Sequence, residues 1–286
     1  MGLRYSICSE IFKGWELREM CKLCSGLGYE GLEIAPFMFA EDVRQCGAAE
    51  RRKMLRTLGE EGLVCSGLHW LLAAPKGLHL ATDDEDLRRR SWDYLGEVIR
   101  FCADLGGTRM IFGSPHQRSA REGWSVAEAK ERLIEGLGRM GPIAEAGGVI
   151  LMMEAVSSKE TNVVTTLDQA AEIVDAVGHP NIQTMFDFHN AADELGGNTS
   201  GGAQYLELLK RHYPKIRHVH VNEADGRHPG TGSIDFRPVL GWLIEKGYED
   251  WVSLEVFDFS AGPEVIARES IQFLKRIERE LAAAHV

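Results

Sequence analysis

From Gly148 to Glu154 the chain reads Gly-Val-Ile-Leu-Met-Met-Glu, an almost wholly apolar run that ends on a carboxylate. A strand with one wet face alternates apolar and polar residues, whereas a parallel strand that is covered on both faces is apolar throughout. The run therefore predicts a strand buried on both faces, as in a parallel α/β sheet.

Short β-type runs of this kind alternate with longer helical patterns from one end of the chain to the other. One helix is expected to begin with Thr82 as its N-cap and Glu85 completing a capping box. Another is expected to stop at Gly178, with Pro180 close behind. The predicted strands cover residues 3–8, 31–34, 63–69, 110–113, 148–154, 182–187, 216–221 and 251–256, and the predicted helices cover 15–26, 48–61, 83–105, 125–146, 166–177, 203–212, 236–247 and 263–284.

Eight strand–helix units follow one another without a low-complexity linker. This order predicts an α/β fold, a single (β/α)8 TIM barrel in which residues 1–286 form one domain. The length, about 36 residues per unit, suits such a barrel. The alternative is an open, doubly wound sheet, which would carry a glycine-rich phosphate-binding turn after its first strand. Residues 9–14 read Ser-Glu-Ile-Phe-Lys-Gly and are not such a turn.

Composition limits the classes of partner. The chain has 286 residues, 43 acidic and 32 basic, for a net charge of −11. This charge argues against nucleic acid and anionic membranes as partners. No apolar run reaches the roughly 18 residues that a membrane helix needs. Cys21 and Cys24 lie at helical spacing with their apolar neighbours, which predicts buried thiols rather than a redox or zinc pair. We expect a reduced, cytoplasmic protein.

Acidic residues end three of the apolar strands. They are Glu154, Asp187 and Glu255, and His220 ends the strand between the last two. The carboxyl ends of barrel strands meet at one rim, where three carboxylates would repel each other. A divalent cation would relieve this repulsion, and three carboxylate oxygens with one imidazole favour Mn²⁺ or Mg²⁺, with Co²⁺ or Fe²⁺ tolerated. The alternative is that each acid pairs separately with Arg or Lys across the rim.

His218 and His220 point to the same side of one strand, so only the later one easily reaches the rim. His220 is therefore our ligand, and His218 is expected to pack behind it. Other polar residues near the rim are candidates for holding substrate hydroxyls. They are Glu33, His69, His116 and His189.

These segments together resemble the sugar isomerase/epimerase barrels related to xylose isomerase, especially the ketose 3-epimerases of the D-tagatose 3-epimerase type. The matching pieces are Met-Phe-Asp-Phe-His around Asp187, His-Val-His-Val-Asn-Glu over 218–223, Pro-Gly-Thr-Gly-Ser-Ile-Asp over 229–235, and the segments that begin at Glu154 and end at Glu255. The His-x-His segment followed by the glycine-rich stretch is the most specific part.

The resemblance implies that Glu154, Asp187, His220 and Glu255 bind a divalent metal, with Mn²⁺ expected first and Mg²⁺ or Co²⁺ as alternatives. It also implies that Glu154 and Glu255 carry protons on opposite faces of the substrate, and it places substrate contacts at Glu160 and Arg227. His189 follows the aspartate by two residues, where the epimerases have their histidine three residues on, and Arg227 lies one residue later than their arginine. Homodimers or homotetramers are expected from the same resemblance.

The predicted function is a metal-dependent sugar isomerase or epimerase that acts on a ketose or related keto-sugar through an enediolate. The alternative with the same metal is a dehydratase or β-eliminating lyase on an inosose or 3-keto-glycoside. A metal-dependent endonuclease would need a basic groove, which the charge of −11 opposes. A sugar-binding barrel without activity is the last alternative.

Overall fold

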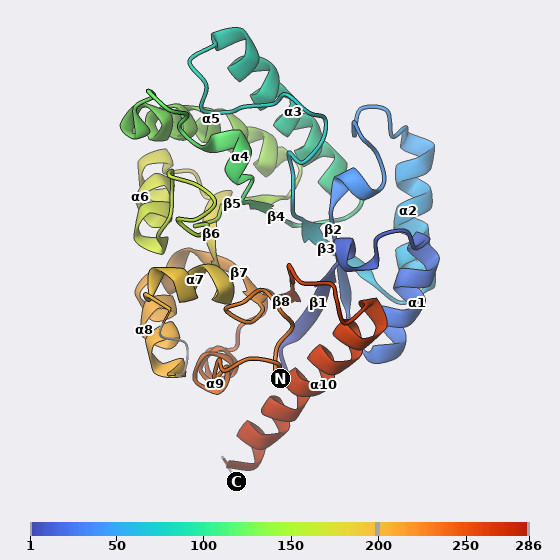
Figure 1. The fold of residues 1–286 in the computed structure, drawn as a ribbon. Helices are drawn as coiled ribbons and strands as arrows, with labels where there is room; N and C mark the ends of the chain where they lie inside the picture. Colours follow the sequence, from blue (N-terminus) through green and yellow to red (C-terminus); the bar gives the residue numbers. More distant parts are fainter. Residues whose placement is uncertain (1, 198–200, 285–286) are drawn as a thin grey trace.

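The structure is a computed structural model, and it describes residues 2–197 and 201–284. Eight parallel strands close into a barrel in sequence order, with β8 hydrogen-bonded to β1 and the helices arranged around the outside (Figure 1). The predicted (β/α)8 barrel is confirmed. The strands are β1 Arg4–Cys8, β2 Gly31–Ile34, β3 Val64–Leu68, β4 Arg109–Phe112, β5 Ile150–Met153, β6 Ile182–Asp187, β7 Ile216–Val221 and β8 Trp251–Leu254.

The helices that connect the strands follow the predicted segments, and several short helices add to them. Short helices follow β1, β2, β4 and β6 directly, at the rim where the acids lie, while η3 leads into β7. The helices are η1 Ser9–Phe12, α1 Leu17–Leu27, η2 Pro36–Met38, α2 Ala48–Glu60, α3 Glu85–Asp104, α4 Pro115–Arg118, α5 Val126–Ala146, α6 Leu167–Val177, α7 Phe188–Glu194, α8 Gly202–His212, η3 Tyr213–Lys215, α9 Arg237–Glu245 and α10 Pro263–Ala284.

The predicted cap of α3 was wrong by two residues. Asp84 is the N-cap, and its Oδ1 accepts a hydrogen bond from the Leu87 backbone N–H at 3.0 Å. Thr82 instead accepts from the Asp84 backbone N–H at 3.2 Å, so it orders the turn before the helix. Both residue types make such local bonds, and sequence spacing alone does not choose between them.

Strand β5 shows how the barrel directs side chains toward the site. Met152 packs with Ile111 of β4 and Met185 of β6 in a small cluster separate from the main core. Side chains two residues apart on a strand share a face, so Glu154 and Asp187 extend beyond Met152 and Met185 on the same side. Leu151 and Met153 belong instead to the large core shared with the surrounding helices.

All six cysteines are free and buried, including Cys21 and Cys24 on α1, which confirms the prediction for that pair. None of the helices within residues 2–197 and 201–284 combines the length and the apolar character that crossing a membrane requires.

Candidate active site

The four side chains predicted as metal ligands converge at the carboxyl ends of β5 to β8. Each of Glu154, Asp187, His220 and Glu255 offers one ligand atom, and these atoms lie within 4.8 Å of one another. All four residues are buried. Because they come from four different strands, closure of the barrel is what brings them together.

The His220 ring is oriented by a carboxylate beneath it. Its Nε2 lies 3.0 Å from Glu33 Oε1, and a hydrogen bond there leaves Nδ1 as an acceptor. Within residues 2–197 and 201–284, Nδ1 has no assigned hydrogen-bond partner; it lies 2.9 Å from Glu255 Oε2 and 3.7 Å from Asp187 Oδ2. Acceptors that face each other in a buried site are stabilised when a cation lies between them. The donor set therefore fits a divalent ion.

The electrostatics of the group agree with this fit. Burial and the nearby charges of Glu255 and Asp187 raise the pKa of Glu154 well above its ordinary value. Burial also raises the pKa of Glu255. Burial opposes a charge on His220, but Glu255 and Glu33 outweigh it and raise the pKa of the imidazole. The pKa shifts of Glu154 and His220 both reflect a concentration of buried negative charge, which a dication would balance.

Two asparagines that the sequence analysis missed hold the acids in place. Asn190 Nδ2 donates to Glu154 Oε1 at 3.1 Å, and Asn222 Nδ2 donates to Asp187 Oδ2 at 2.9 Å. The other Asp187 oxygen caps helix α7 by accepting from the Asn190 backbone N–H at 2.7 Å. The capping spacing from Asp187 to Asn190 was readable in the sequence, whereas the contact with Glu154 was not.

A fully buried arginine, also missed, supports the Glu154 backbone. Arg118 Nη1 donates to the Glu154 carbonyl at 2.8 Å and to the Phe112 carbonyl at 3.3 Å, and Nη2 donates to the Val164 carbonyl at 3.3 Å. Burial lowers the pKa of Arg118 to about 10, against the opposing effect of the Glu154 carboxylate. The guanidinium thus ties the ends of β4 and β5 to the loop that follows β5.

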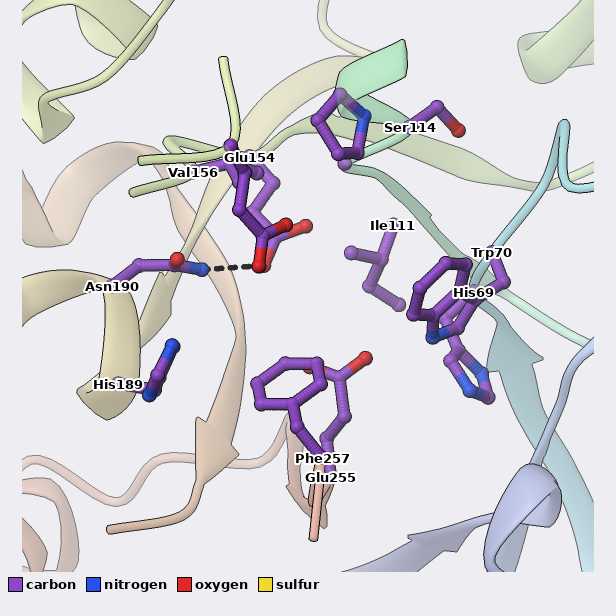
Figure 2. Close-up of a pocket in the computed structure, with 13 residues that line it drawn as sticks. His69, Trp70, Ile111, Ser114, Glu154, Val156, His189, Asn190, Glu255 and Phe257 are labelled. Atoms are coloured by element: carbon purple, nitrogen blue, oxygen red, sulfur yellow. Dashed lines mark hydrogen bonds between the residues drawn. The ribbon is translucent and has the colours of Figure 1, made fainter. Parts of the chain in front are cut away.

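A cavity at the carboxyl ends of the strands is lined by two of the four side chains, Glu154 and Glu255 (Figure 2). Glu154 and Glu255 face it from different sides, and the half-exposed rings of Trp70 and Phe257 form part of its wall. The lining residues are His69, Trp70, Ile111, Gly113, Ser114, Pro115, Glu154, Val156, Glu160, His189, Asn190, Glu255 and Phe257.

A family model described as "Xylose isomerase-like TIM barrel" matches residues 21–277. The chain belongs to the xylose isomerase-like TIM barrel family. Among the relatives of this xylose isomerase-like barrel, an inosose isomerase of Bacillus velezensis is 34% identical over 258 residues, which cover 84% of this chain and 83% of that protein. The L-ribulose 3-epimerase of Mesorhizobium japonicum is 27% identical over 84% of this chain and 76% of its own length.

Solved structures of similar fold include the 3-keto-D-glucoside 4-epimerase of E. coli, with a TM-score of 0.77 and 16% identity over 96% of this chain and 99% of that chain. The D-psicose 3-epimerase of Clostridium cellulolyticum, solved with D-tagatose, has a TM-score of 0.75 and 18% identity over 98% of this chain and 97% of that chain. The named relatives are epimerases and isomerases, and this xylose isomerase-like barrel is an enzyme of the isomerase class.

Of the six residues expected to hold substrate hydroxyls, three line the cavity of the xylose isomerase-like barrel: His69, Glu160 and His189. His189 lies at the start of α7, where its ring is 5.0 Å from that of Phe257. His69 presents its ring to the cavity, but its Nε2 lies 2.5 Å from Glu10 Oε2 and its Nδ1 lies 3.5 Å from Glu33 Oε1. Both nitrogens of His69 are therefore directed at carboxylates.

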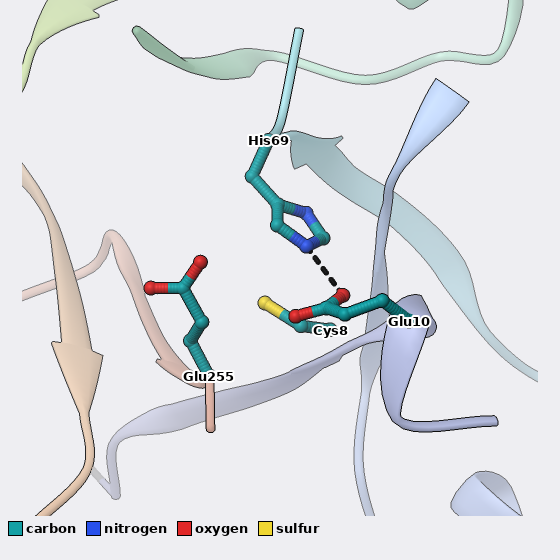
Figure 3. Close-up of side chains that lie close together, drawn as sticks. All are labelled: Cys8, Glu10, His69 and Glu255. Carbon is teal, nitrogen blue, oxygen red and sulfur yellow. Dashed lines mark hydrogen bonds and ion pairs between the residues drawn. The ribbon is translucent and has the colours of Figure 1, made fainter. Parts of the chain in front are cut away.

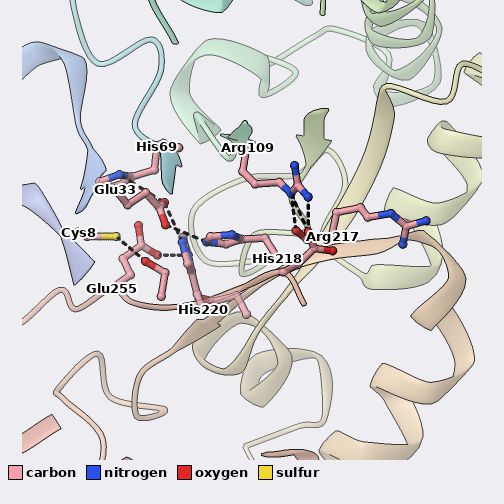
Figure 4. Close-up of polar contacts among 12 residues, drawn as sticks. Cys8, Glu33, His69, Arg109, Arg217, His218, His220 and Glu255 are labelled. Carbon is pink, nitrogen blue, oxygen red and sulfur yellow. Dashed lines mark hydrogen bonds and ion pairs between the residues drawn. The ribbon is translucent and has the colours of Figure 1, made fainter. Parts of the chain in front are cut away.

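The other three do not reach the cavity, which corrects their expected placement. Glu33 is fully buried below it, where its oxygens bond His218 Nε2 at 2.8 Å and His220 Nε2 at 3.0 Å (Figure 4). His116 is exposed on α4, although the two residues before it line the cavity. Arg227 is exposed and donates from Nε to Asp225 Oδ2 at 2.8 Å. Depth in the barrel decides the placement of Glu33, and a local ion pair holds Arg227.

Proposed function

We propose that this enzyme is a divalent-metal-dependent sugar epimerase or isomerase that acts on a ketose or related keto-sugar. The observation that carries the proposal is the convergence of Glu154, Asp187 and Glu255 around the unpartnered Nδ1 of His220. Relatives named L-ribulose 3-epimerase, ketose 3-epimerase and inosose isomerase support a carbonyl-bearing polyol as the substrate class.

Glu154, Asp187, His220 and Glu255 would hold the ion, and Mn²⁺ fits this oxygen-rich set best, with Mg²⁺ or Co²⁺ as alternatives. When bound, a divalent ion polarises a substrate carbonyl and stabilises the negative charge that develops on its oxygen. Asn190 and Asn222 keep the Glu154 and Asp187 carboxylates oriented for this role.

The proton transfers belong to Glu154 and Glu255. One glutamate removes the proton from the carbon between the carbonyl and a neighbouring hydroxyl, which leaves an enediolate. The other returns a proton, and because the two follow β5 and β8 and face the cavity from different sides, return to the opposite face gives an epimer (Figure 2). Return to the adjacent carbon interconverts aldose and ketose instead.

The cavity wall supplies the substrate contacts. Glu160 and His189 are placed to bind hydroxyl groups, and Trp70 and Phe257 offer apolar faces to the C–H face of a sugar. The chain thus combines a polar floor, which carries the reaction, with a partly aromatic wall, which positions the substrate.

Proton exchange tests the proposal directly. We expect the Mn²⁺-loaded enzyme, incubated with a panel of ketoses in heavy water, to place deuterium next to the carbonyl and otherwise retain the sugar's mass. Glu154→Gln and Glu255→Gln should each abolish exchange, whereas Glu172→Gln on the exposed side of α6 should not. Chelation should stop exchange and Mn²⁺ should restore it.

Two results would contradict the proposal. Loss of water or of an aglycone from the substrate would identify the β-eliminating alternative. Full exchange in the metal-free enzyme would remove the metal from the reaction.

A further inference from the structure

A second group of ligand-type side chains lies beside Glu255. Cys8 ends β1, Glu10 lies in η1, and His69 directly follows β3. One ligand atom from each of Cys8, Glu10, His69 and Glu255 lies within 4.8 Å of the others, and all four residues are buried (Figure 3). Like the first group, this one is assembled from segments far apart in the sequence.

His69 and His220 are arranged in the same way around Glu33. His220 directs Nε2 to Glu33 Oε1 at 3.0 Å and Nδ1 to the first group, while His69 directs Nδ1 to the same oxygen at 3.5 Å and Nε2 to the second group (Figure 4). Metal-binding histidines typically give their other ring nitrogen to a carboxylate in this manner. A single buried glutamate therefore lies beside two histidines whose other ring nitrogens face two neighbouring groups of acceptors. It bonds His220, whereas its 3.5 Å approach to His69 Nδ1 is too long for a hydrogen bond.

Several atoms of the second group have unused bonding capacity. Glu10 Oε1 is buried and has no hydrogen-bond partner among the residues that the structure describes, although Glu10 Oε2 contacts His69. Cys8 Sγ makes a long contact of 3.9 Å with Ser253 Oγ and also lies beside the rings of His69 and His220. Buried polar atoms normally find partners, so this shortfall points to a missing ligand.

The number of buried carboxylates around the cavity also favours the binding of more than one dication. Five buried carboxylates, those of Glu10, Glu33, Glu154, Asp187 and Glu255, surround this region. Cys8 as a thiolate adds a sixth negative charge, and with neutral histidines Arg118 and one dication balance three of the six. A second dication balances two of the remaining three. Buried charges that lack compensation cost several kcal/mol each.

We propose that Cys8, Glu10, His69 and Glu255 bind a second divalent transition-metal ion, with Glu255 shared between the two sites. A sulfur and an imidazole nitrogen favour Zn²⁺, Co²⁺ or Fe²⁺ over Mg²⁺, whereas the first site is rich in oxygen. The inference rests on the proposed function only in that Glu255 belongs to both sites.

Cobalt titration of the metal-free protein tests this site, because a Co²⁺–thiolate bond adds a charge-transfer absorption that oxygen and nitrogen ligands do not give. We expect two Co²⁺ ions per chain by elemental analysis, together with this band. Cys8→Ser should remove the band and one ion, and Asp187→Asn should lose the other ion and keep the band. Cys21→Ser, at a buried thiol on α1, should retain both ions and the band.

A wild-type stoichiometry of one Co²⁺ per chain, or a band that survives in Cys8→Ser, would overturn the second site. Should Cys8→Ser not fold, Glu10→Gln is the replacement: it should weaken binding of one ion at least tenfold, and unchanged binding of both would equally overturn the site. Deuterium exchange into the sugar, measured on wild-type enzyme loaded with Mn²⁺, reports separately on the proposed function. Exchange that persists with one ion per chain leaves that function intact and rejects only the second site.

Discussion

Replacing Glu33 by glutamine should weaken divalent-metal binding, although Glu33 does not line the cavity. The Glu33 carboxylate accepts from His220 Nε2 at 3.0 Å and from His218 Nε2 at 2.8 Å, one oxygen each. A glutamine side chain has one acceptor oxygen and one amide donor, so it can serve only one of the two histidines. The other then meets an N–H group, and the orientation of His220 is lost or weakened.

The magnitude follows from the bond that is lost. A hydrogen bond to a charged group contributes about 1.5–3 kcal/mol, and about 1.4 kcal/mol corresponds to a factor of ten in an equilibrium constant. The Mn²⁺ dissociation constant should therefore rise about 10- to 100-fold, which is the range found for carboxylates behind metal-binding histidines. Isothermal titration calorimetry of metal-free Glu33→Gln with Mn²⁺ measures this dissociation constant.

Glu30→Gln is the matched control, since Glu30 lies three residues earlier, is exposed and pairs loosely with Arg4 at 3.6 Å. It should bind Mn²⁺ as the wild type does. If Glu33→Gln folds with a wild-type circular dichroism spectrum and binds Mn²⁺ within twofold of the wild type, then Glu33 does not orient His220, and the reasoning fails.

Three further changes follow from the structure. A Cβ at Gly113 would lie 2.3 Å from Glu154 Oε2, so Gly113→Ala should displace that carboxylate and lower kcat about 100-fold, whereas Gly138→Ala, with open space around it on α5, should leave kcat unchanged. Arg118→Met leaves the Glu154 carbonyl without its guanidinium donor and should lower the free energy of unfolding by about 1–3 kcal/mol in urea titrations; an unchanged midpoint would show that the bond contributes nothing. Burial, with a contribution from Arg121, lowers the pKa of His79, whose ring nitrogens have no hydrogen-bond partner in the described part of the chain. The folded protein then resists protonation that the unfolded chain accepts, so stability should fall as pH drops below about 6.5 toward the folded-state pKa, and His79→Gln should flatten this loss in thermal melts recorded across pH.

The barrel itself could be predicted because each strand is recognisable from its own apolar residues. Apolar runs such as the one before Glu154 are visible without any knowledge of neighbours, and each ends where the parallel rim must lie. The four converging side chains were found for the same reason: an acid or histidine at the end of a buried strand stands out from its surroundings.

The depth of each side chain could not be read from the sequence. Glu33 lies opposite Cys8 in register, and the pairing of β2 with β3 shifts between Leu32 and Glu33. A shift of this kind decides whether a polar side chain reaches the cavity or stays beneath it, and no local pattern encodes it. For Arg227 the deciding factor was an ion pair with Asp225 in an irregular loop.

Asp187 is both the N-cap of helix α7 and a member of the candidate metal site. One of its oxygens fastens the first turn of α7, the other faces the cluster, and the same turn carries His189 on the cavity wall. The first turn of α7 therefore connects His189, on the cavity wall, to Asp187, a candidate metal ligand. If the proposed sites are correct, a substitution that destabilises α7 should alter both substrate binding and metal binding.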